Sequence, residues 1–391
     1  PVARGARRWS LENLAGGRIV KGQFDIAEPL RRRIPGTGEE LSGDTRVQLE
    51  VEDVQFNVVG DIPPVRNADG SVVFADGLTT VSLNRGVVYL PGGQTASAKD
   101  GVLVIPRAVE QTGLIRASLS LGISGKSRAI GELISFNPIG AQQYYAFEPE
   151  DLSGDVSGQV NVDFLINGEN GADPDWDVDL NVAKAASAAK IEGRDLDSLD
   201  GRILVDPQRA EFELEGNIDG FPSNISMTVP FANSEVAARR DIKLLLDTPK
   251  REQLAPGLDV ILTGNTPVKV AGSGESLQIE ADLTPATLTL PWIGWAKGEG
   301  VEASAEFNLL QGDTITTLEN FKLSGGSFGA TGEIDADSLG LKRARFGFAK
   351  LNQGDDVSLD VTRNGDGYDV DVSGNAFDAV SYTHLTLPTK I

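Results

Sequence analysis

Apolar and polar residues alternate along most of the chain. The alternation is clearest in four runs: Val47, Leu49 and Val51; Leu277, Ile279, Ala281 and Leu283; Val357, Leu359 and Val361; and Val370 with Val372. A period of two places apolar side chains on one face of a β-strand and polar side chains on the other. The pattern therefore predicts strands that bury one face and leave the other in water.

Turn-forming dipeptides separate the alternating runs at short intervals. They include Asp69-Gly70, Gly92-Gly93, Asp100-Gly101, Asp200-Gly201 and Asn364-Gly365, and residues 71–106 are predicted to form consecutive hairpins. Connections this short leave no room for crossover helices, so the strands should pair antiparallel. We expect only short helices, over residues 3–15, 127–135 and 249–254.

The composition excludes several classes of protein. The 391 residues carry 57 acidic and 35 basic side chains, a formal net charge of −22, which repels a phosphate backbone and argues against nucleic acid as a partner. The chain has no Cys and one His, His384, so disulfides, thiolate chemistry and His-based triads are not expected. No nucleotide-binding motif fits, and no cofactor is predicted.

Weak breaks in the pattern divide the chain into three β modules, over residues 1–148, 149–265 and 266–380. The chain begins at Pro1 without a signal peptide, so we expect an anchor or export signal to precede it in the full-length protein. The last segment, residues 381–391, departs abruptly from the Asp/Gly-rich sequence before it and resembles translated adapter read-through. We therefore exclude this tail from functional reasoning.

Two motifs suggest ligand sites but fit structural roles better. The alternating Asp173, Asp175, Asp177 and Asp179 lack the Gly and Glu that a calcium loop needs at its sixth and twelfth positions. They are better explained as the water-facing side of a strand. The Gly-rich segment 325–332 has no Lys for phosphate binding and is predicted to form a hairpin with small residues where strands crowd.

Two features suggest contact with a membrane. Trp292 and Trp295 flank a Gly, and indoles favour the headgroup level of a bilayer; the alternative is a corner between strands where the indoles cap a core. Residues 1–33 carry eight basic and three acidic side chains, 8 − 3 = +5, which suits anionic headgroups. The alternative for this stretch is a solvated helix face and a polar loop.

Several loosely spaced motifs together resemble one family. They are Ala6-Arg7-Arg8-Trp9, Glu12-Asn13-Leu14-Ala15-Gly16-Gly17, Pro63-Pro64-Val65, Trp292-Ile293-Gly294-Trp295 and Gly354-Asp355-Asp356-Val357. Over residues 1–380 the chain resembles the central domain of YhdP-like proteins, which belong to the AsmA-like superfamily together with TamB. The resemblance consists of turns and strands, without a catalytic signature.

The resemblance implies a mainly β fold, an elongated, curved antiparallel β-sheet that forms a repeating apolar β-groove, with a few short helices. It implies a non-enzymatic periplasmic protein, anchored in the bacterial inner membrane, that guides phospholipid between inner and outer membranes with other envelope proteins as partners. It supplies no catalytic, cofactor-binding or metal-binding residues. We expect the clearest alternating positions to line the groove: Val47, Leu49, Val51, Leu277, Ile279, Leu283, Val357, Leu359 and Val361.

Alternation alone does not separate an open groove from the closed core of a β-sandwich. One alternative function is therefore an extracytoplasmic β-sandwich module that binds protein or glycan through an acidic face. Another is a carboxylate-dependent glycan hydrolase, which needs two carboxylates about 5–10 Å apart in a cleft.

Overall fold

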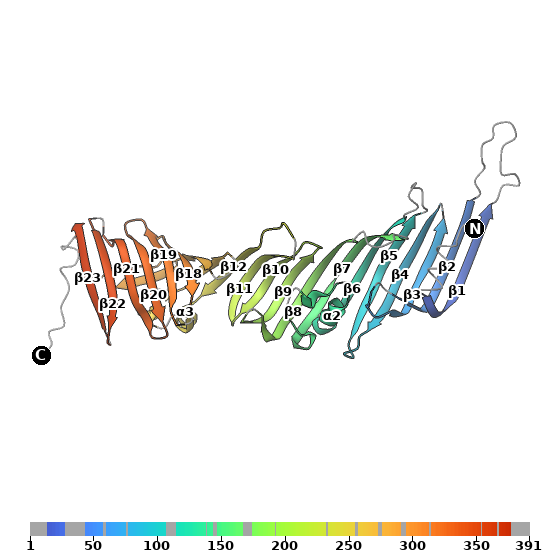
Figure 1. Ribbon diagram of the computed structural model, residues 1–391, viewed down its shortest axis with the longest axis horizontal. Helices are drawn as coiled ribbons and strands as arrows, with labels where there is room; N and C mark the ends of the chain where they lie inside the picture. Colours follow the sequence, from blue (N-terminus) through green and yellow to red (C-terminus); the bar gives the residue numbers. More distant parts are fainter. Residues whose placement is uncertain are drawn as a thin grey trace, which may run out of the picture. The chain divides into compact units, whose positions relative to one another are not determined.

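The computed structural model describes residues 14–376 except for 28–43, 58–59, 76, 107–114, 138, 144–146, 167–173, 192, 232–233, 255–256, 273–275, 291–294, 313, 353 and 366. The chain divides into two compact units, each built mainly from antiparallel strands (Figure 1). Unit 1 runs to Asp219 and includes Pro230–Val236; unit 2 contains Gly220–Val229 and continues from Ala237. The three modules expected from the sequence stay a prediction, and the tail 381–391 lies outside the described residues.

In the described part of unit 1, ten strands of one sheet pair antiparallel in chain order. The strands are β1 (Leu14–Ala27), β2 (Asp44–Phe56), β3 (Val65–Ala75), β4 (Leu78–Tyr89), β5 (Thr95–Pro106), β6 (Ile115–Lys126), β7 (Leu152–Ile166), β8 (Asp175–Ile191), β9 (Arg194–Val205) and β10 (Arg209–Ile218). The hairpins predicted over residues 71–106 are confirmed by β3, β4 and β5.

Unit 2 repeats this arrangement, and its described residues form ten strands of a main sheet. They are β11 (Phe221–Pro230), β12 (Arg239–Leu246), β14 (Thr266–Ala271), β15 (Ser276–Asp282), β18 (Ala303–Gln311), β19 (Thr316–Gly325), β20 (Gly329–Asp337), β21 (Gly340–Lys350), β22 (Asp356–Asn364) and β23 (Gly367–Ala376). A second, small sheet contains β13 (Leu262–Gly264), β16 (Ala286–Leu290) and β17 (Trp295–Lys297).

The described helices are short. Helix α2 spans Ser127–Ser135, as predicted, and α3 spans Thr248–Leu254, close to the predicted turn at 249–254; the other helical segments are 3₁₀ turns at Ala141–Gln143, Pro149–Asp151 and Leu258–Val260. The helix predicted for residues 3–15 is wrong at its end, because Leu14 and Ala15 begin β1 and pair with β2; residues 3–13 lie outside the described part. No helix among the described residues is long and apolar enough to cross a membrane.

Each main sheet is covered only in part, which sets it apart from a closed sandwich. Among the described residues, unit 1 has one helix, α2, packed on its sheet, and unit 2 has the small sheet with α3. No large side chain in the described part is completely buried. Two sheets of similar size packed face to face would bury many such side chains, so the sandwich expected as the alternative is not the arrangement of either unit.

β-Bulges interrupt strand after strand and change which residues share a face. Asp53 in β2, Asn67 in β3, Asp100 in β5 and Lys184 in β8 all have positive φ angles, and the pairing register shifts next to each of them. A bulge bends its strand and increases the local twist. Bulges on most neighbouring strands therefore introduce curvature into the sheet of unit 1.

Candidate functional site

One side of the unit 1 sheet is apolar from strand to strand, and we call it the apolar face of unit 1. Directly paired residues point to the same side of an antiparallel sheet. Their pairing joins a row across β2 to β8 made of Leu49, Val72, Val81, Leu103, Leu119, Val162 and Trp176. All seven side chains remain partly exposed. At about 4.8 Å per strand, the row is roughly 29 Å long.

Helix α2 covers a different part of this face (Figure 1). Its Ala129, Ile130 and Leu133 pack in a buried cluster with residues near one end of the strands, such as Ala96 and Val156. The seven residues of the row are outside that cluster. The helix therefore closes one end of the face and leaves the row open.

Unit 2 has an equivalent apolar face. A row across β15 to β23 contains Leu277, Leu309, Leu318, Ile334, Ala344, Val361 and Val370. Ala344 is buried, Val370 is 53% exposed and the others are partly exposed.

Aromatic side chains line the next row of the same face. Phe307 stacks on Phe321 with ring centroids 6.1 Å apart, and Phe321 meets Phe346 edge-on at 5.9 Å. Gly332 pairs with both Phe321 and Phe346. Because Gly332 has no side chain, the two rings can touch across it.

The small sheet covers one end of the apolar face of unit 2. Leu262 and Leu288 of this sheet pack against Ala281, Ala303 and Ala305 of the main sheet. None of the residues in the row from Leu277 to Val370 belongs to this cluster. As in unit 1, one end of the face is closed and the rest is open.

A buried arginine ties this cover to the main sheet. Arg251 of α3 is 3% exposed, and its Nη1 donates to the carbonyl oxygens of Leu246 at 2.9 Å and Gly264 at 2.6 Å. Nη1 also donates to Thr266 Oγ1 at 3.0 Å, and Nη2 donates to the Leu262 carbonyl at 3.1 Å. Burial lowers the pKa of Arg251. One guanidinium thus joins α3, β12, β13 and β14.

Lys297 has a similar role at β17. It is 3% exposed. Its Nζ donates hydrogen bonds to three carbonyl oxygens: that of Leu283, that of Ala286 at 2.6 Å and that of Thr284 at 3.2 Å. Burial lowers its pKa, while the nearby charges of Asp282 and Glu299 act in the opposite direction. These bonds hold the turn between β15 and β16 against the small sheet.

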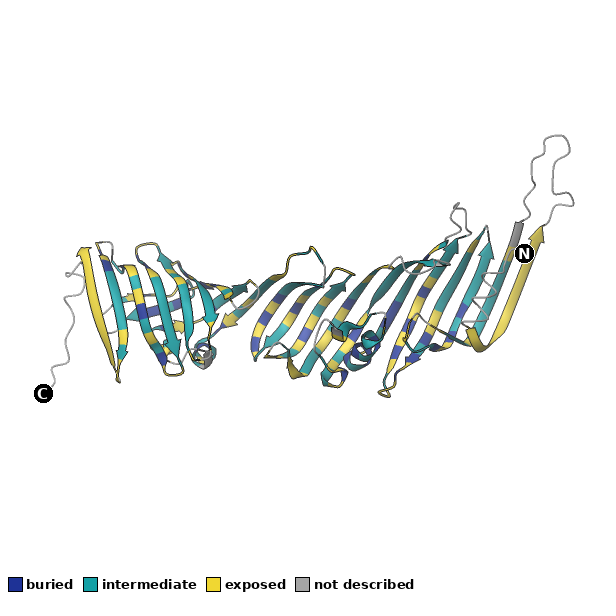
Figure 2. Cartoon of the chain, viewed as in Figure 1, coloured by how far each residue is buried: buried dark blue, intermediate teal, exposed yellow. Residues whose placement is uncertain are grey.

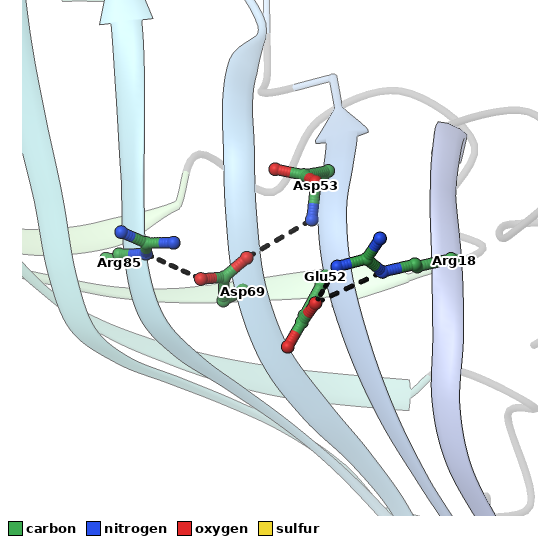
Figure 3. A network of polar contacts seen from close by, with 5 residues as sticks. All are labelled: Arg18, Glu52, Asp53, Asp69 and Arg85. Atoms are coloured by element: carbon green, nitrogen blue, oxygen red, sulfur yellow. Dashed lines mark hydrogen bonds and ion pairs between the residues drawn. The ribbon is translucent and has the colours of Figure 1, made fainter.

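The opposite side of each sheet is polar and carries ion pairs between neighbouring strands. In unit 1, Arg18 pairs with Glu52 at 2.6 Å, and Arg85 Nε donates to Asp69 Oδ2 at 2.5 Å (Figure 3). Asp69 also accepts a hydrogen bond of 3.2 Å from the backbone N–H of Asp53, the bulge residue of β2. The bonds from Arg85 and Asp53 lower the pKa of Asp69. The charged side chains of this polar side favour contact with water. We therefore expect an apolar ligand to bind the apolar face on the opposite side of the sheet.

The residues predicted to line a groove all belong to the apolar faces. Val47, Leu49 and Val51 share the face of unit 1 and are partly exposed, as are Leu277, Leu359 and Val361 in unit 2. Three others are buried: Ile279 at 8%, Val357 at 9% and Leu283 at 4% exposure. Leu283 lies under the small sheet. The open surface is therefore formed by the six partly exposed residues, together with paired residues that the sequence did not single out.

Of the two tryptophans predicted to contact a membrane, the structure describes only Trp295. Trp292 lies outside the described residues. Trp295 belongs to β17, where its Nε1 donates to the Leu351 carbonyl at 2.9 Å and its rings pack edge-on against Phe328 at 5.1 Å. These contacts favour the alternative interpretation, in which the indole caps a core at a corner of unit 2.

The basic stretch is described only in part. Arg18 and Lys21 lie on β1 and pair with Glu52 and Glu50 of β2. These two cations are therefore compensated within unit 1, whereas residues 1–13 and 28–33 lie outside the described part.

The Asp and Gly motifs have the structural roles that the sequence favours. Asp175, Asp177 and Asp179 alternate along the polar side of β8, opposite Asp163, Asn161 and Gln159 of β7, while Asp173 lies outside the described residues. In the part of the chain that is described, no group of three or more acidic, His or Cys side chains is placed to hold a metal ion. The segment 325–332 forms part of a hairpin, as predicted: residues 326–328 make the turn between β19 and β20, and residues 329–332 begin β20 and pair with β19.

Sequence reasoning missed the rows that join the strands. The signal was present as a change of phase: Val47, Leu49 and Val51 occupy odd positions, whereas Val54 and Phe56 occupy even ones, and the bulge at Asp53 puts all five on one face. Comparisons with family models, curated proteins and solved structures find no match to this chain. The functional argument therefore rests on the apolar faces themselves.

Proposed function

We propose that this chain belongs to a non-enzymatic cell-envelope protein of the AsmA-like, YhdP type that carries phospholipid along its apolar faces. The observation that supports the proposal is the open row of paired apolar side chains in each unit, from Leu49 to Trp176 and from Leu277 to Val370. The resemblance of the sequence to the family supplies the location: a periplasmic protein held at the inner membrane, with envelope proteins as partners.

The energetics of a diacyl lipid suit such a face. Each CH₂ group costs about 0.8 kcal/mol in water, so a lipid with roughly thirty of them does not leave a membrane without a substitute apolar surface. A row of partly exposed Leu, Val and Trp side chains offers that surface over roughly 29 Å in unit 1. The headgroup can stay in water at the edge of the face, so no buried counter-charge is required.

Lipid binding is tested by expressing the 391-residue chain in a bacterial periplasm and measuring co-purified phospholipid by native mass spectrometry and lipid extraction. Leu49→Asp and Leu277→Asp each place a carboxylate in an open row. Desolvating that carboxylate costs at least about 1.4 kcal/mol when an acyl chain covers it, so we expect bound phospholipid to fall at least about tenfold.

The matched controls are Gln48→Asp and Gln278→Asp. Each places the same new side chain one residue away, on the polar side of the same strand, and should leave bound phospholipid unchanged. Circular dichroism checks that all four variants keep their strands. A folded wild-type chain without phospholipid, or equal losses in face variants and controls, would contradict the proposal.

A further inference from the structure

Two strand pairs of unit 1 contain the same polar contact, in which a carboxylate holds a bulge on the neighbouring strand. Asp69 of β3 accepts a hydrogen bond of 3.2 Å from the backbone N–H of Asp53 in β2 (Figure 3). Asp200 of β9 accepts one of 3.1 Å from the backbone N–H of Lys184 in β8. Both donors have positive φ angles, 55° and 50°, and both lie 16 residues before their acceptor. Because a bulge leaves its extra residue outside the ladder, each carboxylate satisfies an N–H that the neighbouring strand does not. We call these two contacts the bulge clamps of unit 1.

The sheet bends toward its apolar face beside both bulge clamps. A glycine follows each clamp carboxylate, Gly70 in β3 and Gly201 in β9. A Cβ on Gly70 would overlap the carbonyl oxygen of Ser82 in β4, and a Cβ on Gly201 would overlap that of Glu213 in β10. In a regular sheet a side chain stands roughly perpendicular to the sheet and does not meet the backbone of the next strand. The next strand has therefore moved toward the side on which that Cβ would lie, which is the apolar side at both glycines.

The two bends lie on either side of the open surface. Most of the open row, from Val81 in β4 to Trp176 in β8, lies between them. Partly exposed residues recur on every strand from β2 to β10 (Figure 2). Hydrophobic stabilisation of a bound chain grows with the apolar area removed from water. A face that bends inward on both sides covers the flanks of an acyl chain, whereas a flat face covers only one side of it.

We propose that Asp69 and Asp200 are positioning residues for lipid binding: each holds a bulge that bends the apolar face of unit 1 around the acyl chain. The inference rests on the proposed function and adds residues that do not touch the lipid, because both carboxylates lie on the polar side of the sheet. The recurrence of the whole arrangement on two separate strand pairs supports it. A residue with a Cβ adopts a positive φ only at a cost, and the chain bears that cost at the same point of both copies.

Deletion of Lys184 removes one bend without changing which residues form the apolar face. Val182 and Ala185 lie on the same side of β8, since they pair with Gly201 and Leu199 of β9. The deletion reduces their separation from three residues to two, the period of a regular strand. The matched control is Lys184→Gly. It removes the same side chain but keeps the bulge, because Gly adopts a positive φ readily and retains the backbone N–H.

Labelling with a photoreactive lipid measures how closely unit 1 holds an acyl chain. Vesicles of phosphatidylethanolamine with a diazirine on one acyl chain are mixed with the 391-residue chain, illuminated, and the labelled peptides are quantified by mass spectrometry. The readout is the label on β4 to β7 divided by the label on β18 to β21, so unit 2 serves as the internal reference. We expect this ratio to fall several-fold when Lys184 is deleted and to stay unchanged in Lys184→Gly.

Substitutions of Asp200 test the clamp at constant chain length, so the inference stays testable even where the deletion variant does not fold. Asp200→Ala removes the acceptor and should lower the ratio, whereas Asp200→Asn keeps an acceptor oxygen and should restore it. Hydrogen–deuterium exchange of α2 checks for a merely structural effect. We expect α2 to stay protected in all variants, since Glu132 still accepts the bond of 2.7 Å from the Gly92 N–H.

Three results would overturn the inference: equal ratios in the deletion variant and Lys184→Gly, equal ratios in Asp200→Asn and Asp200→Ala, or loss of α2 protection in parallel with loss of label. The last result would mean that the clamp acts by holding the helix. In each of these cases the unmodified chain is still labelled, so the proposed function stands. An unmodified chain without label in either unit would contradict the proposed function and this inference together.

Discussion

Replacing Arg251 with Met should destabilise unit 2, because it removes the side chain that holds the small sheet on the main sheet. The Met side chain is similar in length to that of Arg, but it is apolar and has no hydrogen-bond donors. Three carbonyl oxygens, those of Leu246, Gly264 and Leu262, would lose their guanidinium partner in a site where Arg251 is 3% exposed. Two hydroxyls also accept from Arg251, Thr266 Oγ1 from Nη1 and Thr248 Oγ1 from Nη2, but a hydroxyl can rotate, so the count is restricted to the carbonyl oxygens.

The expected loss follows from these three acceptors. A buried polar group left without a partner costs about 1–3 kcal/mol, and removing the guanidinium also removes its own cost of burial. The lower end of the range for three carbonyls gives a loss of about 3 kcal/mol. For a unit of this size, that corresponds to a fall in Tm of roughly 6–12 °C.

The assay combines urea unfolding with hydrogen–deuterium exchange resolved by peptide. We expect a lower unfolding midpoint and faster exchange in β13, β16 and β17, with β3 to β7 of unit 1 unchanged. Lys250→Met is the matched control: Lys250 is the preceding residue, and its ion pair with Asp247 at 3.4 Å is partly exposed, so its loss should stay below about 1 kcal/mol. A difference between the two variants of less than about 0.5 kcal/mol would refute the role assigned to Arg251.

Two further predictions concern the sheets. Gly332→Ala should lower stability by about 1–3 kcal/mol, because its new Cβ would overlap the carbonyl oxygen of Arg345 in β21. Gly347→Ala is the control and should leave stability unchanged, because the space around its Cβ is open. Thermal unfolding compares the two variants, and equal Tm values would contradict the close approach at Gly332. Asp179 has its pKa lowered below its ordinary 3.8, mainly by the hydrogen bond from Arg202. The stability this adds is present above pH 3.8 and is lost as pH falls through the lowered pKa. Urea titrations at neutral and acidic pH should therefore show a smaller acid-induced loss in Asp179→Asn, and an identical loss would contradict this contribution.

Much of the local structure could be predicted from the sequence. Period-two alternation predicted strands such as β2, β15 and β22, and short turns predicted their antiparallel pairing. The helix over Ser127–Ser135 was also predicted, since Pro138 follows it closely. These features depend on interactions between near neighbours in the chain, which a single sequence displays directly. The end of the first predicted helix failed, because pairing of Leu14 and Ala15 with β2 overrode their helical pattern.

The sequence by itself determined that strands of this protein have one apolar and one polar side. Only the tertiary structure decided that Leu49 lies in one row with Trp176, because each bulge shifts the alternation by one residue and the shift has meaning only against a partner strand. The tertiary structure also decided which apolar positions are covered. Leu277 and Leu283 belong to the same alternating run in the sequence, yet Leu283 lies beneath the small sheet whereas Leu277 is partly exposed. Alternation in the sequence indicates that a side chain faces an apolar surface. Which surface it faces depends on elements that are distant in the sequence.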